Sequence, residues 1–207
     1  MINGIDVSHL DGEIDWKQVA GSSLKPKFAF VKCSQGTRFT DPRLAHNVLG
    51  ATNAGLQIGV YHFVHLDEPG ADQACFVFDV LAKAQISLPT LPIVLDLEDD
   101  PAMPGLASHV GKDAIRRLVG AFSAAVQKKT FKLPMLYGSP AWLDEWVGDG
   151  FGGHPLWIAE YGVQSPRLPQ GWAHWNCWQR SSAGRVPGIR GDVDINVWGG
   201  ALPGVVK

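Results

Sequence analysis

Eight short apolar segments, spread along the whole chain, constrain the fold more than any other feature of the sequence. They cover residues 2–7, 28–33, 58–63, 91–97, 133–137, 155–161, 175–179 and 193–197. Each is rich in Val, Ile, Phe, Trp or Tyr, and each is short enough to be a buried β-strand rather than a helix. A chain of 207 residues with this many buried strands can form one substantial core.

Helical periodicity follows each of the first five strands and is missing after the last three. The predicted helices cover residues 15–20, 41–54, 67–86, 112–129 and 139–147. Asp41 and Pro42 predict the start of the second helix, as a cap and a first-turn proline. Strand–helix alternation predicts a parallel sheet, and eight such strands can close into a barrel. The alternative is an open doubly wound sheet, but the chain lacks the Gly-rich phosphate turn of that fold.

Polar and aromatic side chains mark the ends of nearly all these strands. In a parallel barrel the active site forms where the strands end, so these residues are the candidates for function. They are Asp6, Lys32, Ser34, Tyr61, His62, Asp96, Glu98, Tyr137, Glu160, Tyr161, Gln179, Asp194 and Asn196. Acids from both ends and the middle of the chain should therefore converge on one rim of the barrel.

The segment LPIVLDLEDD contains the pair of acids that most suggests catalysis. Asp96 and Glu98 are two residues apart at the end of a strand, so their side chains point to the same face. Two carboxyls on one partly apolar face do not ionise independently, and the pKa of one should rise. Glycoside hydrolysis uses such a pair, although a capping or metal-binding acid at a strand end fits D-x-E equally well.

Composition excludes several other classes of function. The net charge of -2 gives no electrostatic basis for binding nucleic acid. No apolar run is long enough for a transmembrane helix, and the acidic start of the chain does not resemble a signal peptide. The three cysteines form no C-x-x-C pair and no histidine stands at metal-ligand spacing, so we expect no metal and no cofactor.

The motifs in order resemble glycoside hydrolase family 25, the Chalaropsis-type lysozymes. The resemblance runs almost end to end through GIDVSHLDGEIDW, FAFVKCSQGTRFTDPRLAHN, AGLQIGVYHF, LPIVLDLE, PMLYGS, PLWIAEYG and CWQRSSAGRVPGIRGDVDIN. It implies a TIM-like (β/α)5(β)3 barrel formed by one catalytic domain over residues 1–207. It also implies hydrolysis of the β-1,4 bond between N-acetylmuramic acid and N-acetylglucosamine in peptidoglycan.

The resemblance also implies roles for individual residues. Glu98 would be the general acid, and the acids that join it in the cleft would be Asp6, Asp96 and Asp194. The residues expected to bind sugar are Tyr61, Tyr137, Trp157, Gln179 and Asn196. Three positions depart from the family pattern: Gln35 replaces a glutamate, Arg180 a tyrosine and Trp198 a phenylalanine. None is one of the four acids, so the departures bear on cleft shape rather than on activity.

These inferences define the expected partner and the alternatives. We expect a monomer that acts on peptidoglycan glycan strands at the bacterial cell wall, with no nucleic-acid partner and no insertion into a membrane. A wall-binding module without catalysis and a chitinase-like glycosidase on the same barrel are the competing functions. The spacing of Asp96 and Glu98, roughly 6.5 Å along a strand, leaves retention and inversion at the sugar carbon both open.

Overall fold

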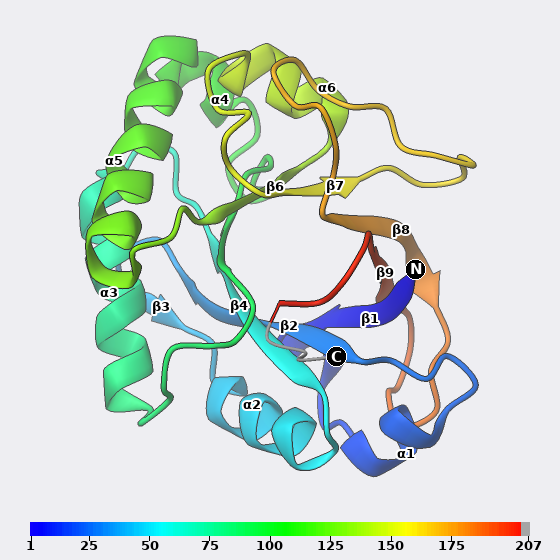
Figure 1. Ribbon diagram of the computed structural model, residues 1–207. Helices are drawn as coiled ribbons and strands as arrows, with labels where there is room; N and C mark the ends of the chain where they lie inside the picture. Colours follow the sequence, from blue (N-terminus) through cyan, green and yellow to red (C-terminus); the bar gives the residue numbers. More distant parts are fainter. Residues whose placement is uncertain (204–207) are drawn as a thin grey trace.

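The structure of the protein, a computed structural model, describes residues 1–203 and is a closed barrel with helices packed around part of its outside (Figure 1). Eight strands close the barrel, and a ninth, β3 (Phe39–Thr40), pairs with the end of one of them. The eight are β1 (Ile2–Val7), β2 (Phe28–Gln35), β4 (Gln57–Phe63), β5 (Ile93–Asp96), β6 (Met135–Gly138), β7 (Leu156–Ala159), β8 (Cys177–Gly184) and β9 (Val193–Trp198). All eight predicted strands are present.

Strand pairing closes the ring and confirms the predicted fold class. The pairs from β1 through β2, β4, β5, β6 and β7 to β8 are parallel. The last strand, β9, is antiparallel to both of its neighbours, β8 and β1, and closes the barrel between them. The connection from β8 to β9 contains no helix, which allows this antiparallel pairing.

Helices follow the first five barrel strands, as the periodicity predicted. They are α1 (Trp16–Gly21), α2 (Leu44–Asn53), α3 (Gly70–Lys83), α5 (Lys112–Thr130) and α6 (Pro140–Trp142), with α6 continued by a π-helical turn over Leu143–Val147. Two short helices were not predicted, the 3-10 helix at His9–Asp11 and α4 (Leu106–Val110). No helix within residues 1–203 combines the length and the apolar character needed to cross a membrane.

The start of α2 differs from the prediction. The helix begins at Leu44, and Asp41 does not cap it. One oxygen of the Asp41 carboxylate accepts a hydrogen bond from the backbone N–H of Arg43, just ahead of the helix. The other accepts from the backbone N–H of His9 and from its ring Nδ1, at 3.0 and 2.8 Å. Asp41 therefore ties the loop after β1 to the loop after β2, a contact between segments that lie far apart in the sequence.

Two apolar clusters build the core. One fills the layer between the strands and the helices. The other fills the barrel interior with large side chains, among them Phe28, Phe30 and Trp157. Glycines make room for the two phenylalanines: a Cβ on Gly4 would lie 2.4 Å from the ring of Phe28, and one on Gly59 would lie 2.2 Å from that of Phe30. The interior is therefore closed by side chains below the site described next.

Candidate active site

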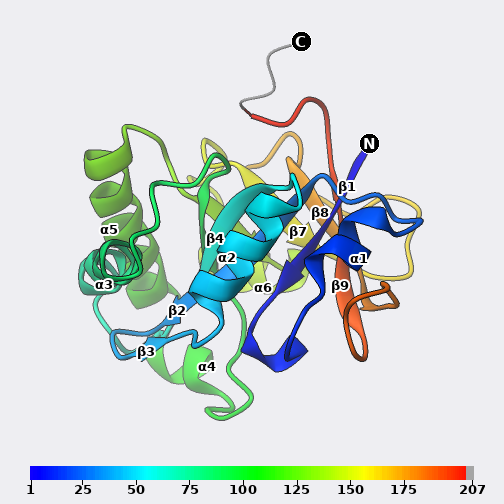
Figure 2. The same cartoon turned by 90° about the horizontal axis from the view of Figure 1, so that it is seen from below.

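The interior face of each strand continues from core residues to polar residues at the end of the strand. Phe28 and Phe30 of β2 point inward, so Lys32 is the next residue on the same face. Val94 and Asp96 follow the same rule on β5, as do Cys177 and Gln179 on β8. The pleat thus delivers polar side chains from several strands to one end of the barrel, where β3, α4 and the loop between β8 and β9 also lie (Figure 2).

One cavity of about 80 Å³ at this end gathers the predicted acids. We call it the central cavity. The residues that line it are Asp6, Tyr61, Asp96, Glu98, Tyr137, Trp157, Gln179 and Asp194. All four carboxyls expected in the cleft are among these residues, although they come from β1, β5, the loop after β5 and β9. Seven of the lining positions lie on barrel strands, so a rigid scaffold holds the site.

Asp6 and Asp194 form a pair of facing acids. They are directly opposite each other in the antiparallel pairing of β1 with β9. Asn196 Nδ2 and Gln179 Nε2 both donate to Oδ1 of Asp6, at 2.6 and 3.0 Å. Burial and the charge of Asp194 raise the pKa of Asp6 well above its ordinary range, and burial raises the pKa of Asp194 to about 6. Near neutral pH the two acids do not both carry a full charge.

Asp96 lies deeper in the cavity than Glu98. Its side chain is buried, and its Oδ1 atom has no hydrogen-bond partner within residues 1–203. Burial, followed by the charge of Glu98, raises the pKa of Asp96 well above its usual range, and the nearby ammonium group of Lys32 opposes that rise. Protonation of Glu98 removes its repulsion, so Asp96 ionises more easily when Glu98 holds a proton.

Glu98 is the acid that a substrate reaches first. The residue is exposed at the mouth of the cavity, while Leu97 beside it is buried in the layer under the helices. Loss of hydration raises the pKa of the Glu98 carboxyl to about 7, helped by the charge of Asp194 and opposed by Lys32. At neutral pH this carboxyl can therefore both donate and accept a proton.

Aromatic side chains and one amide form the floor and wall of the cavity. Trp157 stacks on Phe30 with ring centroids 4.5 Å apart and meets Tyr137 edge to face at 4.7 Å. Oε1 of Gln179 accepts hydrogen bonds from the hydroxyl groups of Tyr137 and Tyr161, at 2.8 and 2.5 Å. The network orients flat rings and polar atoms around the acids, an arrangement suited to a sugar.

Asn196, predicted to bind sugar, does not line the central cavity in this structure. It is fully buried, its Nδ2 donates to Asp6, and its Oδ1 accepts from Nε1 of Trp157 at 2.8 Å. It therefore fixes an acid and an aromatic ring from below. Of the other candidates at strand ends, Lys32 lies near Asp96 and Glu98, and Tyr161 lies against Gln179.

Three other polar residues at strand ends point away from the cavity. Ser34 Oγ and Gln73 Oε1 hydrogen-bond the two ring nitrogens of His62, at 2.8 and 3.0 Å. Burial lowers the pKa of His62 to about 4, so this histidine is a neutral part of the wall. Glu160 turns outward and accepts a hydrogen bond from the backbone N–H of Arg167.

The departures from the family pattern also have definite positions. Gln35 accepts a hydrogen bond from Nζ of Lys32 at 2.9 Å, so an amide stands where a carboxylate would neutralise the lysine. Arg180 is exposed. Trp198 packs edge to face on Phe28 inside the barrel and lies at the end remote from the acids.

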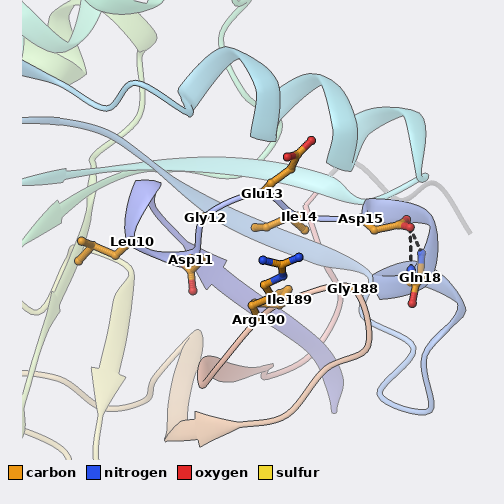
Figure 3. Close-up of a pocket in the computed structure, with 10 residues that line it drawn as sticks. All are labelled: Leu10, Asp11, Gly12, Glu13, Ile14, Asp15, Gln18, Gly188, Ile189 and Arg190. Carbon is orange, nitrogen blue, oxygen red and sulfur yellow. Dashed lines mark hydrogen bonds between the residues drawn. The ribbon is translucent and has the colours of Figure 1, made fainter.

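A larger hollow of about 770 Å³ lies at the same end of the barrel, between the loop after β1 and the loop between β8 and β9 (Figure 3). Asp11 and Arg190 point into it, and Asp15 hydrogen-bonds Gln18 at its far side. Asp11 links this hollow to the acids because its charge raises the pKa of Asp194. The converging carboxyls themselves lie in the smaller central cavity.

The central cavity offers acid–base chemistry without a metal cluster. Among residues 1–203, no group of three or more His, Cys, Asp or Glu side chains is arranged to hold a metal ion. A carboxyl that titrates near neutral pH, beside a second, more deeply buried carboxyl, can protonate a leaving oxygen and stabilise the positive charge that then forms.

Comparison with known proteins agrees with this geometry. The model of "Glycosyl hydrolases family 25" matches residues 5–189. Lysozyme M1 of Streptomyces globisporus is 33% identical over 97% of this chain and 68% of the relative. The N,O-diacetylmuramidase of Chalaropsis sp is 30% identical over 93% of this chain and 96% of the relative. The crystal structure of the bacterial lysozyme from Streptomyces coelicolor superposes with a TM-score of 0.84 at 32% identity, over 97% of this chain and 93% of that one.

The match of the family model and the shared barrel lead to one assignment. The chain belongs to glycosyl hydrolases family 25 and is a glycoside hydrolase.

Proposed function

We propose that the protein is a muramidase that cleaves the β-1,4 bond between N-acetylmuramic acid and N-acetylglucosamine in peptidoglycan. The observation that carries the proposal is the position of Glu98, exposed at the mouth of a cavity of acids and aromatic rings with a pKa of about 7. The lysozyme and N,O-diacetylmuramidase relatives support the choice of substrate. Such a substrate would place the enzyme's action at the bacterial cell wall.

In the first step Glu98 acts as the general acid. Its proton passes to the oxygen that leaves with N-acetylglucosamine, as the bond from that oxygen to the anomeric carbon breaks. The carbonyl oxygen of the 2-acetamido group then attacks the same carbon from the opposite face. The electron pair of the broken bond stays on the leaving oxygen, and positive charge develops on the ring and the acetamido group.

Asp96 stabilises this positive charge and orients the acetamido group. Its Oδ1 atom is buried without a partner, so it can accept a hydrogen bond from the acetamido N–H. A negative charge fixed in a cavity of low polarity stabilises a nearby cation more strongly than a charge in water does. In the second step ionised Glu98 takes a proton from water, which attacks the anomeric carbon and restores the acetamido group.

The remaining residues set the charge and shape of the site. Asp194 raises the pKa of Glu98, and Asp6 shares protons with Asp194 on the neighbouring strand β9. Tyr61, Tyr137 and Trp157 would contact the sugar rings, and Gln179 holds two of the hydroxyl groups that border the cavity. All these residues act through binding, orientation and charge.

The decisive experiment is analysis of the products from purified peptidoglycan. Mass spectrometry after reduction with borohydride should find new reducing ends on N-acetylmuramic acid. New ends on N-acetylglucosamine, or cleavage of chitin oligomers in preference to peptidoglycan, would favour a chitinase-like enzyme instead. Sedimentation with the wall and no new reducing ends would indicate a binding module. NMR of the first product should show the β anomer, because two displacements retain configuration.

The pH dependence follows from the raised pKa of Glu98. The proton donor must be protonated, so kcat/KM on a soluble glycan should fall above about pH 7, by about tenfold per pH unit. Asp194→Asn removes a charge that raises this pKa, so the falling limb should move to lower pH. Asp192→Asn is the matched control, because Asp192 is exposed and paired with Arg185. A falling limb that stays in place in Asp194→Asn would contradict the coupling.

A further inference from the structure

Lys32 is a buried cation without an ion-pair partner. It differs in its burial from every other lysine and arginine in residues 1–203, which are all at least partly exposed. Within this part of the chain no carboxylate oxygen lies within 4.0 Å of its Nζ atom. Because an unpaired charge is costly to bury, the position of Lys32 requires an explanation.

Neutral groups hold the ammonium group of Lys32 in place. Its Nζ donates a hydrogen bond to Oε1 of Gln35 at 2.9 Å, and the ring centroid of Phe63 lies 4.8 Å away. An amide carbonyl and the face of an aromatic ring both attract a cation, but neither carries a net charge. The positive charge of Lys32 is therefore left to act on carboxyl groups that lie farther away.

Strand pairing brings Lys32 to the side of the central cavity where Asp96 lies. Lys32 is paired with Tyr61 of β4, which lines the cavity. Two residues farther along β4, on the same face of the sheet, Phe63 is paired with Asp96 of β5. The aromatic ring that Lys32 contacts thus belongs to the cross-strand neighbour of Asp96.

The charge of Lys32 acts more strongly on Asp96 than on Glu98. Burial lowers the pKa of the Lys32 ammonium group, and nearby carboxylates oppose this effect, Asp96 first, followed by Asp41 and Glu98. Burial and the charges of the other acids raise the pKa of Asp96, whereas Lys32 lowers it. When the two acids share one negative charge, Lys32 therefore favours that charge on Asp96 and the proton on Glu98.

The other titratable groups near this pair of acids include no second lysine or arginine. They are His9, Asp6, Asp11, Asp41, Tyr61, His65, Asp99, Asp100, Tyr137, Tyr161 and Asp194. Most of them are acids or phenols, which disfavour a negative charge on Asp96. Lys32 thus supplies the permanent positive charge in this set.

Gln35 connects Lys32 to an acid through a neutral group. Its Nε2 lies 3.4 Å from Oδ2 of Asp100 and 3.1 Å from Nε2 of His65, while its Oε1 accepts from Lys32. A carboxylate at this position would neutralise Lys32 and would also face Asp100 with a like charge. An amide can bind the cation at one end and the acid at the other without either effect.

We propose that Lys32 is a positioning residue whose charge keeps Asp96 ionised while Glu98 holds the proton, and that the neutral amide of Gln35 preserves this charge. The two acids are then in the state that the reaction requires, with a carboxylate to stabilise the sugar cation and a carboxyl to donate a proton. This inference rests on the proposed function, since it takes the roles of Asp96 and Glu98 from it. It requires no contact between Lys32 and the sugar.

The test measures kcat/KM against pH on a soluble glycan for Lys32→Met and Gln35→Glu. The first variant removes the positive charge and the second neutralises it, so both carboxyls should bind their protons more tightly. We expect both limbs of the pH profile to move to higher pH by about one unit, with kcat/KM at the original optimum lower by about tenfold. Lys83→Met and Gln127→Glu, at exposed positions on α3 and α5, are the matched controls.

Gln35→Met separates the charge at this position from the hydrogen bond. Methionine has a similar length and no charge, so both limbs should stay within about 0.3 pH unit of their original positions. A shift in Gln35→Met as large as that in Gln35→Glu would assign the effect to the lost hydrogen bond and overturn the proposal. Limbs that stay in place in Lys32→Met or Gln35→Glu would also overturn it, because a structural role lowers the rate and the melting temperature without moving the pH profile.

A measurement that needs no activity keeps this proposal separate from the proposed function. If the unaltered protein releases no muramic acid ends, the proposed function fails by itself. ¹³C NMR titration of the Glu98 carboxyl, assigned by its absence in Glu98→Gln, then decides the role of Lys32. The titration should move to higher pH in Lys32→Met and Gln35→Glu, and an unchanged titration would overturn the proposal. If Lys32→Met does not fold, Gln35→Glu decides the result.

Discussion

Glu98→Gln is expected to lower kcat for glycan hydrolysis by about 10²–10⁴-fold while the barrel remains folded. Glutamine has nearly the shape of glutamate and keeps a polar group at the mouth of the cavity, but it has no proton to give to the leaving oxygen. The loss should therefore appear in kcat, and KM for a soluble glycan should change little. Release of reducing ends over time from a purified substrate measures both constants.

Stability distinguishes this catalytic loss from damage to the fold. The pKa of Glu98 is raised from 4.5 to about 7 in the folded protein, so the folded state holds its proton more tightly than the unfolded chain. That contribution to stability is complete below about pH 4.5 and is lost as the pH rises through about 7. An amide has no charged form to penalise, so Glu98→Gln at pH 8 should melt at the same temperature as the unaltered protein or higher.

The matched control for this variant is Glu145→Gln, which alters an exposed glutamate in the π-helical turn after α6. It should retain full activity. Hydrolysis by Glu98→Gln within about threefold of the unaltered rate would remove Glu98 from the acid role, because a general acid contributes far more than that. Lost activity together with a lower melting temperature at pH 8 would point to a structural role instead.

The barrel was predictable because its strands carry large apolar residues on both faces and its helices carry them on one. The segment at 2–7 agrees with β1 to the residue, and the helix predicted at 112–129 agrees with α5 to within one residue. The start of α2 was predicted wrongly because the Asp41 carboxylate bonds the backbone N–H of Arg43, ahead of the helix, and His9, rather than a backbone N–H of the first helical turn. A local pattern shows only the nearby backbone N–H groups, whereas the structure brings His9 within reach from 32 residues away.

The site was predictable as far as it depends on strand alternation. Asp96 follows Val94, Tyr137 follows Met135 and Gln179 follows Cys177, each pair on the interior face of its strand. Alternation gives the face of a residue but not its depth. Asn196 shares the interior face with Asp194, yet it lies two residues deeper along β9 and is completely covered.

An irregularity in the pairing of β2 explains why strand alternation did not predict the position of every residue at the end of that strand. A register shift between Lys32 and Ser34 in the pairing of β2 with β4 breaks the alternation where β2 approaches the site. Lys32 therefore stays with the acids, while Ser34 turns to His62 in the outer layer. The sequence could have shown that Lys32 points inward, because it lies at the same alternation as Phe28 and Phe30. The outward turn of Ser34 depends on a β-bulge, which has no comparable signature in the sequence.

Asp96→Asn should lower kcat/KM by about 10²–10³-fold, the loss typical when one fixed group that stabilises transition-state charge is removed. The buried carboxylate opposes the positive charge on the sugar, and its unpartnered Oδ1 accepts the acetamido N–H. An amide is neutral, and in one of its two orientations it presents a second donor to that N–H.

The control is Asp113→Asn, since Asp113 is exposed on α5, outside the cavity. Steady-state kinetics on stripped glycan strands, with NMR of the product anomer, measure the effect and its cause together. Retention in the unaltered enzyme with a large loss in Asp96→Asn agrees with acetamido participation. An α anomer as first product would instead make Asp96 or Asp6 the base for a single displacement by water. Activity of Asp96→Asn within about threefold of the unaltered enzyme would exclude Asp96 both as this base and as the group that stabilises the positive charge.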